Sequence, residues 1–427
     1  MSEKTQGSDT RVVIHEWLAE HEQQTAQVLR EMTRCRSVQG QETQIQQLLA
    51  GHLERLGMEV DLWEPDGEAL SSHPLFASPR TDFAGSPNLV GRLPGSGGGR
   101  SFLLNGHIDV VPVGDPEQWT QNPWGGELVE GRIYGRGASD MKGGVAASLM
   151  ALQALQACGL RLAGDVIFES VMEEESGGAG TLAASLRGYR ADAGLIPEPT
   201  GLAVFPKQQG SLWFRLTVHG HGAHGGSRYE GVSAIEKAMG VVAAVLELEK
   251  ERNSRITDPL YAATPIPVPI NLGVIRGGAW PSSVPDRVVL EGRMGVAPDE
   301  TIENARAQMG KAISALGQED DWLAKHPVEL EWFGARWLPC SLDTESELVR
   351  ALVEVVEEVR GESPAMVAAP WGTDAGLLGA AAGVPTVVFG PGIAATAHQP
   401  DEYVLLEDVT TAAEVIALML LRWCGRG

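Results

Sequence analysis

Leu104-Asn105-Gly106-His107-Ile108-Asp109-Val110-Val111-Pro112 is the stretch that decides the fold, and it follows the apolar residues Phe102 and Leu103. The short apolar run predicts a buried strand of a parallel sheet. His107 and Asp109 are two residues apart, so in extended chain both side chains point to the same side. Open α/β sheets bind ligands at the carboxyl ends of their strands. This pair therefore predicts a metal-binding imidazole and a carboxylate that orients it.

A second motif, Tyr134-Gly135-Arg136-Gly137-Ala138-Ser139-Asp140-Met141-Lys142-Gly143-Gly144, forms a glycine-rich turn further along the chain. An apolar pattern with helical spacing follows it from Val145 to Leu155. Asp140 thus lies in a turn directly before a helix. A carboxylate in such a turn can bridge two metal ions, so Asp140 is a candidate bridging ligand.

Three consecutive acids, Glu173-Glu174-Glu175, follow the predicted strand Asp165–Met172 and precede two glycines. Glycines allow the backbone to approach a bound ion closely. Strict strand alternation would place Glu173 and Glu175 on one side, so the residue types do not choose among the three acids.

The remaining candidates complete a set of oxygen and imidazole donors. Glu198 lies between two prolines, which restrict its direction, and His398 lies in Ala397-His398-Gln399-Pro400-Asp401-Glu402-Tyr403. The candidates contain no thiol: His107, Asp140, Glu174, Glu175, Glu198 and His398. Such a set suits zinc, cobalt or manganese, and a carboxylate bridge allows two ions. Hydrolysis at such a centre also needs an unligated acid that takes a proton from water.

Composition sets outer limits on function. The formal net charge of −23 argues against nucleic acid or an anionic membrane as partner. The four cysteines are widely spaced without a CxxC motif, which favours reduced thiols and a cytoplasmic protein. No apolar run reaches the roughly 18 residues that a membrane-spanning helix needs.

The length of 427 residues suggests two domains. Strands and helices alternate up to residue 209, which predicts an α/β domain with a mainly parallel sheet flanked by helices. Within it we expect residues 88–93 and 102–105 to pair as a hairpin around the glycine-rich turn 94–100. The α/β pattern resumes over residues 336–427, so the first and last segments, 1–209 and 336–427, are expected to form one discontinuous domain.

Residues 210–335 have a different character. Two helical patterns occur among four amphipathic segments, which predicts an inserted α+β domain with a four-stranded antiparallel sheet and two helices. The predicted strands are Leu212–Val218, Ile270–Ile275, Arg287–Met294 and Val328–Phe333.

The chain from about Val28 onward matches a known pattern, carried by nine motifs in order: HIDVVP, W-x3-PW, YGRGASDMKGG, VMEEESGGAGT, IPEPTG, VHGHGAHGG, GTDAG, GVPTVVFGPG and AHQPDEYV. Together they resemble the co-catalytic zinc amidohydrolases, a group that includes acetylornithine deacetylase, succinyl-diaminopimelate desuccinylase, aminoacylase-1 and glutamate carboxypeptidase. The resemblance covers nearly the whole chain. It implies a catalytic domain from 1–209 and 336–427, and a lid and dimerisation domain from 210–335.

The resemblance also assigns roles to residues. It implies one metal held by His107, Asp140 and Glu198, and a second held by Asp140, Glu175 and His398, with Asp140 as the bridge. Asp109 would orient His107. Glu174, the middle acid of the triplet, would be the general base. The Asp140–Met141 peptide bond is expected to be cis.

In the lid, the resemblance implies that His224 reaches the active site of a partner subunit and donates to the developing oxyanion. The protein would then be a homodimer through the lid. The family often has an asparagine in the lid turn where this chain has Ser282, with Trp280 beside it. Together with Arg293 and Gly392, these residues are the candidate substrate contacts.

The resulting prediction is a dinuclear, metal-dependent amidohydrolase that removes the acyl group of an N-acyl amino acid or related N-acyl amine. Zinc is the first choice of metal, with cobalt or manganese as alternatives. Other possibilities are a deformylase or aminohydrolase of an aromatic or heterocyclic amine, and a dipeptidase or carboxypeptidase. A non-catalytic scaffold of the same fold is the least favoured alternative, because ligands, base and lid histidine are all present.

Overall fold

The computed structural model describes residues 3–427, with side chains from Thr10 onward, so residues 1 and 2 of the expected segment 1–209 lie outside it. The chain divides into two compact units. Unit 1 contains the chain up to Pro206, Leu342–Val367 and Thr373–Gly427, and unit 2 contains Lys207–Ser341 and Ala368–Gly372. Unit 2 is wider than the expected 210–335, because Cys340 and Ser341 pair with Gln208 and Lys207 and so keep the entering and leaving chain together.

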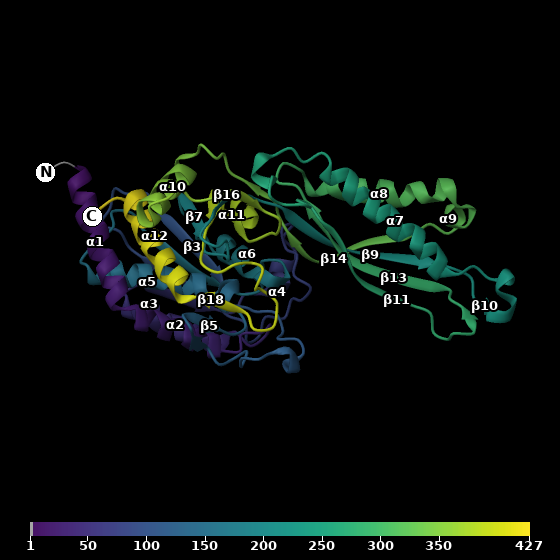
Figure 1. Cartoon of the computed structure of the whole chain (residues 1–427), viewed down its shortest axis with the longest axis horizontal. Coiled ribbons are helices and arrows are strands. Elements are labelled where there is room, and N and C mark those ends of the chain that lie inside the picture. Colours follow the sequence, from purple (N-terminus) through teal and green to yellow (C-terminus); the bar gives the residue numbers. More distant parts are fainter. Residues whose placement is uncertain (1–2) are drawn as a thin grey trace. The chain divides into compact units, whose positions relative to one another are not determined.

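A nine-stranded sheet, most of whose strands belong to unit 1, has the order β1-β2-β6-β3-β7-β17-β8-β15, with β16 paired to β8 (Figure 1). Its central strands β6, β3, β7 and β17 are parallel, and antiparallel strands flank them. The predicted sheet flanked by helices is confirmed. The strands are β1 Glu59–Trp63, β2 Asn88–Leu93, β3 Phe102–His107, β6 Val166–Val171, β7 Ala193–Ile196, β8 Val204–Gln208, β15 Cys340–Ser341, β16 Met366–Ala369 and β17 Thr386–Val388.

The expected hairpin between residues 88–93 and 102–105 is wrong. β6 lies between them, antiparallel to β2 and parallel to β3. Every residue of β3 and β6 is buried, and strands that are apolar on both faces take central positions in a sheet. The carboxyl end of β3, with His107, therefore lies in the middle of the sheet.

Helices cover this sheet. Helix α5 packs against α12 and β3, while α6 packs against α11, β2 and β6. Figure 1 shows α12 alongside α5. The helices of unit 1 are α1 Glu3–Glu20, α2 Glu22–Arg34, α3 Thr43–Arg55, α4 Gly67–Ser71, α5 Gly143–Ala157, α6 Ala179–Leu186, α10 Glu347–Arg360, α11 Ala375–Ala382 and α12 Leu406–Cys424.

A small sheet of order β18-β5-β4 joins distant parts of unit 1. Its strands are β4 Glu127–Val129, β5 Arg132–Tyr134 and β18 Tyr403–Leu405. Tyr403 pairs with Tyr134, so the loop that contains His398 is brought next to the turn that contains Asp140.

Unit 2 contains the predicted four-stranded antiparallel sheet, in the order β11-β13-β9-β14. Helices α7 and α8 lie on one face of this sheet, where their apolar residues form one core with Phe214 and Leu290 (Figure 1). The elements are β9 Gly210–His219, β10 Ala223–His224, α7 Ala234–Asn253, β11 Ile270–Gly277, β12 Ser283–Val284, β13 Arg287–Val296, α8 Ile302–Glu319, α9 Asp321–Lys325 and β14 Glu329–Trp337.

Two further features concern membrane-spanning helices and the cysteine side chains. Within residues 3–427, no helix has the length and apolar character required to cross a bilayer. Cys35, Cys158 and Cys424 carry free thiols.

Candidate metal centre

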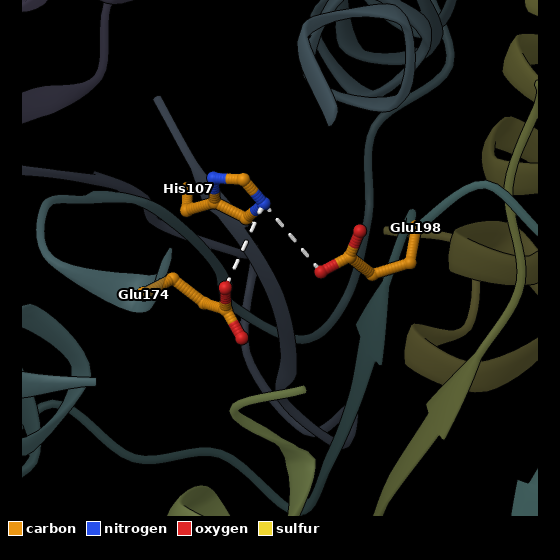
Figure 2. Close-up of side chains that lie close together, drawn as sticks. All are labelled: His107, Glu174 and Glu198. Atoms are coloured by element: carbon orange, nitrogen blue, oxygen red, sulfur yellow. Dashed lines mark ion pairs between the residues drawn. The ribbon is translucent and has the colours of Figure 1, made fainter. Parts of the chain in front are cut away.

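Six predicted site residues converge in unit 1, each at a strand end or in a loop or turn that adjoins a strand or helix. His107 ends β3, Asp140 lies in the turn Ala138–Lys142, Glu174 and Glu175 lie in the turn Glu174–Ser176, Glu198 follows β7, and His398 precedes β18. Figure 2 shows that the carboxylates of Glu174 and Glu198 approach the same ring nitrogen of His107, at 4.0 and 3.6 Å from Nε2.

Asp140 lies between the two imidazoles. Its Oδ1 is 3.0 Å from Nε2 of His107, and its Oδ2 is 3.4 Å from Nε2 of His398. Nε2 of His398 is also 3.0 Å from Oε1 of Glu175. The Asp140–Met141 peptide bond is cis, as the resemblance implied. One carboxylate thus presents one oxygen to each histidine, which is the arrangement that a bridging ligand requires.

Asp109 makes different contacts from those expected. Nδ1 of His107 lies 2.9 Å from the main-chain carbonyl oxygen of Asp109, whereas the Asp109 carboxylate is 3.7 Å away. That carboxylate instead accepts hydrogen bonds from the backbone N–H groups of Glu174 and Glu175, at 3.2 and 3.1 Å. The carbonyl therefore orients the imidazole, and the side chain fixes the turn that carries the two acids.

The three consecutive acids separate into two environments. Glu173 has a left-handed φ of 66°, so strand alternation ends before the triplet. Its buried carboxylate accepts hydrogen bonds from Arg80, Ser78 and Gln39. Glu174 and Glu175 face the imidazoles instead. The grouping of Glu173 with Glu175 that strict alternation allowed is thus excluded.

The cluster carries more negative than positive charge in a buried setting. Burial raises the pKa of Glu174 and of Glu198 well above the usual range. Burial opposes protonation of His107, but its hydrogen bond to Asp140 and the nearby Glu198 raise its pKa well above the ordinary value. Hydrogen bonds to Asp140 and Glu175 raise the pKa of His398 to about 11. Buried carboxylates at this density need cations to balance them.

The donor set fits divalent metal ions. Two overlapping groups have ligand atoms within 4.8 Å of one another: His107 with Glu174 and Glu198, and His107 with Asp140 and Glu175. Imidazole and carboxylate donors without thiolate suit zinc, cobalt or manganese. These residues could therefore hold a metal ion.

Sequence reasoning missed the buried groups that support the cluster. Glu402 accepts hydrogen bonds from the backbone N–H groups of Ser139 and Asp140, and Arg136 donates to it. Both side chains lie inside the motifs that carried the resemblance, but their pairing depends on the contact between β18 and β5. Arg80 belongs to no motif, because it lies in the long segment without regular structure before β2.

The candidate substrate residues fall in both units. In unit 1, Gly392 accepts a hydrogen bond from Gly201 and lies against Ser139, next to Asp140. In unit 2, His224 pairs with Ser283 in the two-stranded β10-β12 ladder. Its Nδ1 accepts the backbone N–H of Gly226 at 3.0 Å, which places the ring proton of neutral His224 on Nε2.

The other three candidates also lie in unit 2. The carbonyl of Ser282 accepts the N–H of Gly225, beside His224. Trp280 is 70% exposed. Arg293 is paired across the ladder with Trp213, and burial lowers the pKa of its guanidinium.

Comparison with known proteins identifies the family. Residues 103–422 match Peptidase family M20/M25/M40. The chain is 30% identical to N-formyl-4-amino-5-aminomethyl-2-methylpyrimidine deformylase of Bacillus subtilis (strain 168), over 90% of this chain and 89% of that protein. It is 28% identical to acetylornithine deacetylase of Proteus mirabilis (strain HI4320), over 88% and 89%. The chain belongs to Peptidase family M20/M25/M40 and is a hydrolase of amide bonds.

The solved structures support the fold. The di-peptidase Dug1p of Saccharomyces cerevisiae superposes with a TM-score of 0.76 at 15% identity, covering 97% of this chain and 98% of that one. The resemblance read from the nine motifs is therefore confirmed at the level of family and fold.

Proposed function

We propose that the chain is a dinuclear metal-dependent amidohydrolase that removes an acyl group from an amine. The observation that carries this proposal is the position of Asp140, with one carboxylate oxygen toward each histidine. One ion would be held by His107, Asp140 and Glu198. The other would be held by Asp140, Glu175 and His398. Zinc is the proposed metal, and cobalt or manganese would suit the same donors.

When bound, two divalent ions polarise the substrate carbonyl and lower the pKa of a water molecule. Glu174 supplies the proton transfers. Its Oε2 would take the proton of the attacking water and return it to the leaving nitrogen. Two features suit it to this role: its side chain is buried beside His107, and the Asp109 carboxylate holds its backbone N–H.

The substrate class that we place first is an N-formyl heteroaromatic amine. Two deformylase relatives are 30% and 31% identical over 403 and 399 residues. Two acetylornithine deacetylases are 28% and 25% identical over 378 residues. The lid turn with Trp280 and Ser282, in place of the asparagine frequent in the family, also favours an aromatic substrate. N-acyl amino acids are the second class, and dipeptides are the third.

The test combines metal content with turnover. We would measure bound metal in purified wild type and Glu174→Ala, and assay N-formyl heteroaromatic amines, N-acetyl and N-succinyl amino acids, and dipeptides. We expect metal in both proteins and turnover only in the wild type. Full turnover by Glu174→Ala would show that another group is the base. Absence of metal from both would refute the metal assignment, and bound metal without any turnover would favour the scaffold alternative.

We also propose that the protein acts as a homodimer, with His224 contributed to the partner's active site. Two features of unit 2 support a self-association surface. β11 is the edge strand of its sheet, so its outer edge has no strand partner among the described residues. Beside it, α7 exposes Ile235, Met239 and Leu246 on one stripe, 45%, 69% and 51% exposed. An open edge next to an apolar stripe is self-complementary under twofold symmetry.

Complementation between inactive variants tests directly whether His224 acts in the active site of the partner subunit. Glu174→Ala and His224→Ala dimers would be assayed alone, and then after subunit exchange. If His224 acts across the dimer, the mixture recovers about a quarter of the wild-type activity, because half of the dimers are mixed and one of their two sites is intact. A mixture as inactive as its components, with exchange verified by mass, would place His224 in its own subunit's site.

A further inference from the structure

A buried ion pair lies behind the metal-binding residues and belongs to neither ligand set. Nη1 of Arg136 donates to Oε2 of Glu402 at 2.6 Å. The two side chains are 3% and 1% exposed. Arg136 lies in the glycine-rich turn before Asp140, and Glu402 lies in the segment between His398 and β18. The pair thus joins two segments that each supply a metal-binding residue.

Glu402 holds the backbone of the bridging residue. Its Oε1 accepts the N–H groups of Ser139 and Asp140, at 3.0 and 3.1 Å. These two hydrogen bonds fix the peptide planes directly before the Asp140 side chain. They therefore determine where the two oxygens of Asp140 lie relative to the imidazoles.

Arg136 holds the other side of the centre. Its Nη1 also donates to the carbonyl oxygen of Gln399 at 3.3 Å, and its Nη2 donates to the carbonyl oxygen of Pro112 at 3.4 Å. Gln399 follows His398 directly, and Pro112 follows the strand-end segment of His107. One guanidinium therefore ties the loop of each histidine to the carboxylate that holds Asp140.

We infer that Glu402 and Arg136 are positioning residues that set the spacing between Asp140 and His398, and hence metal affinity and coordination geometry. This inference rests on the proposed metal-dependent function. It requires a carboxylate at residue 402, because one oxygen faces a cation while the other accepts two N–H groups. Glutamine at residue 402 has one oxygen and one NH₂ group. Its NH₂ group, which donates and cannot accept, must therefore face either the Arg136 guanidinium or the backbone N–H groups of Ser139 and Asp140. Groups that orient metal ligands in this way typically change affinity by about 10- to 100-fold when replaced.

The test is Co²⁺ binding to the metal-stripped protein, with affinity measured by competition with a chromophoric chelator and geometry by the visible absorption spectrum of Co²⁺. Glu402→Gln is compared with wild type and with Glu300→Gln. Glu300 makes a comparable, largely buried pair with Arg252 in unit 2, at 2.7 Å, with side chains 13% and 4% exposed. Both variants lose a buried or largely buried ion pair and some thermal stability. Only Glu402→Gln is expected to bind Co²⁺ about 10-fold or more weakly and to change the spectrum.

Arg136→Lys provides a second variant if Glu402→Gln does not fold. Lysine keeps the charge but lacks the planar fork that reaches both Glu402 and two carbonyl oxygens, so we expect weaker Co²⁺ binding and an altered spectrum. Affinity and spectrum equal to wild type in the folded variant would overturn the inference while leaving the proposed function intact. A wild type that binds neither Co²⁺ nor Zn²⁺ would overturn the proposed function, and the inference with it.

Discussion

Arg80 donates two hydrogen bonds to a single oxygen of Glu173, from Nε at 2.9 Å and from Nη2 at 2.6 Å. Glu173 is completely buried and immediately precedes Glu174. The pair therefore attaches the long irregular segment before β2 to the turn that carries the proposed base.

Removal of Arg80 is expected to be strongly destabilising. Arg80→Ala leaves a buried carboxylate without its cation, which typically costs about 3–5 kcal/mol of the free energy of unfolding. Urea denaturation measures this loss. Arg92→Ala is the control, because the Arg92 pair with Asp165 is substantially exposed and contributes less than about 1 kcal/mol. Equal losses in the free energy of unfolding would show that the Arg80–Glu173 pair stabilises the protein no more than an exposed ion pair does.

The buried carboxyl group of Glu169, outside the candidate metal centre, should make the free energy of unfolding depend on pH. Burial raises its pKa to about 8, while Asn105 donates to its Oε2 at 2.9 Å. A carboxyl group with a raised pKa stabilises the folded state below its unfolded pKa, and this contribution is lost as pH rises toward 8. Glu169→Gln removes the titration. We expect its free energy of unfolding, relative to wild type, to increase by more than about 1 kcal/mol between pH 5 and pH 9. A pH-independent difference would contradict this.

Substitution of Gly392 should lower activity through its contact with Ser139. Its φ is 76°, and an added Cβ would lie 2.6 Å from Oγ of Ser139, next to Asp140. Gly361 has a similar φ of 74° with no atom within 4 Å of such a Cβ. Gly361→Ala should therefore lose only about 1 kcal/mol of stability, the cost of the left-handed backbone. Gly392→Ala should lose more and also lower kcat, because Ser139 must move. Equal activity in both variants would argue against the importance of this contact.

Substitution of Met239 tests whether the exposed apolar stripe of α7 forms the proposed dimer surface. Met239→Glu places a charge in the exposed apolar stripe of α7, so we expect the proposed dimer to dissociate in sedimentation velocity. Lys250→Glu, on the same helix but at a solvated position in contact with Glu247, is the control and should leave the mass unchanged. If wild type is itself a monomer, or the Met239 variant remains a dimer, the α7 surface is not the interface.

The residues that could be predicted from the sequence are those whose local pattern carries the information. His107 and Asp140 could be predicted as site residues because a strand end and a glycine-rich turn can each be recognised from a short stretch of sequence. The strand segments of unit 2 were located because half-buried strands alternate. Strand order was not readable in this way, since β6 enters between β2 and β3 from a later part of the chain.

The supporting groups could not be predicted for a related reason. The roles of Arg80 and Glu402 depend on contacts between distant segments. The separation of Glu173 from Glu174 depends on one left-handed residue, which the run of three identical acids does not reveal. The sequence predicts Asp109 as a neighbour of His107, but only the folded structure separates the contacts of its carbonyl from those of its carboxylate.

The two imidazoles that flank Asp140 come from distant parts of the chain, His107 from the first segment of unit 1 and His398 from the last. During synthesis, Asp140, Glu174, Glu175 and Glu198 emerge from the ribosome long before His398. The nascent polypeptide consequently holds converging carboxylates without the second histidine, and mutual repulsion disfavours their burial at that stage. We therefore expect the candidate metal centre to close only after the segment that contains His398 has been synthesised.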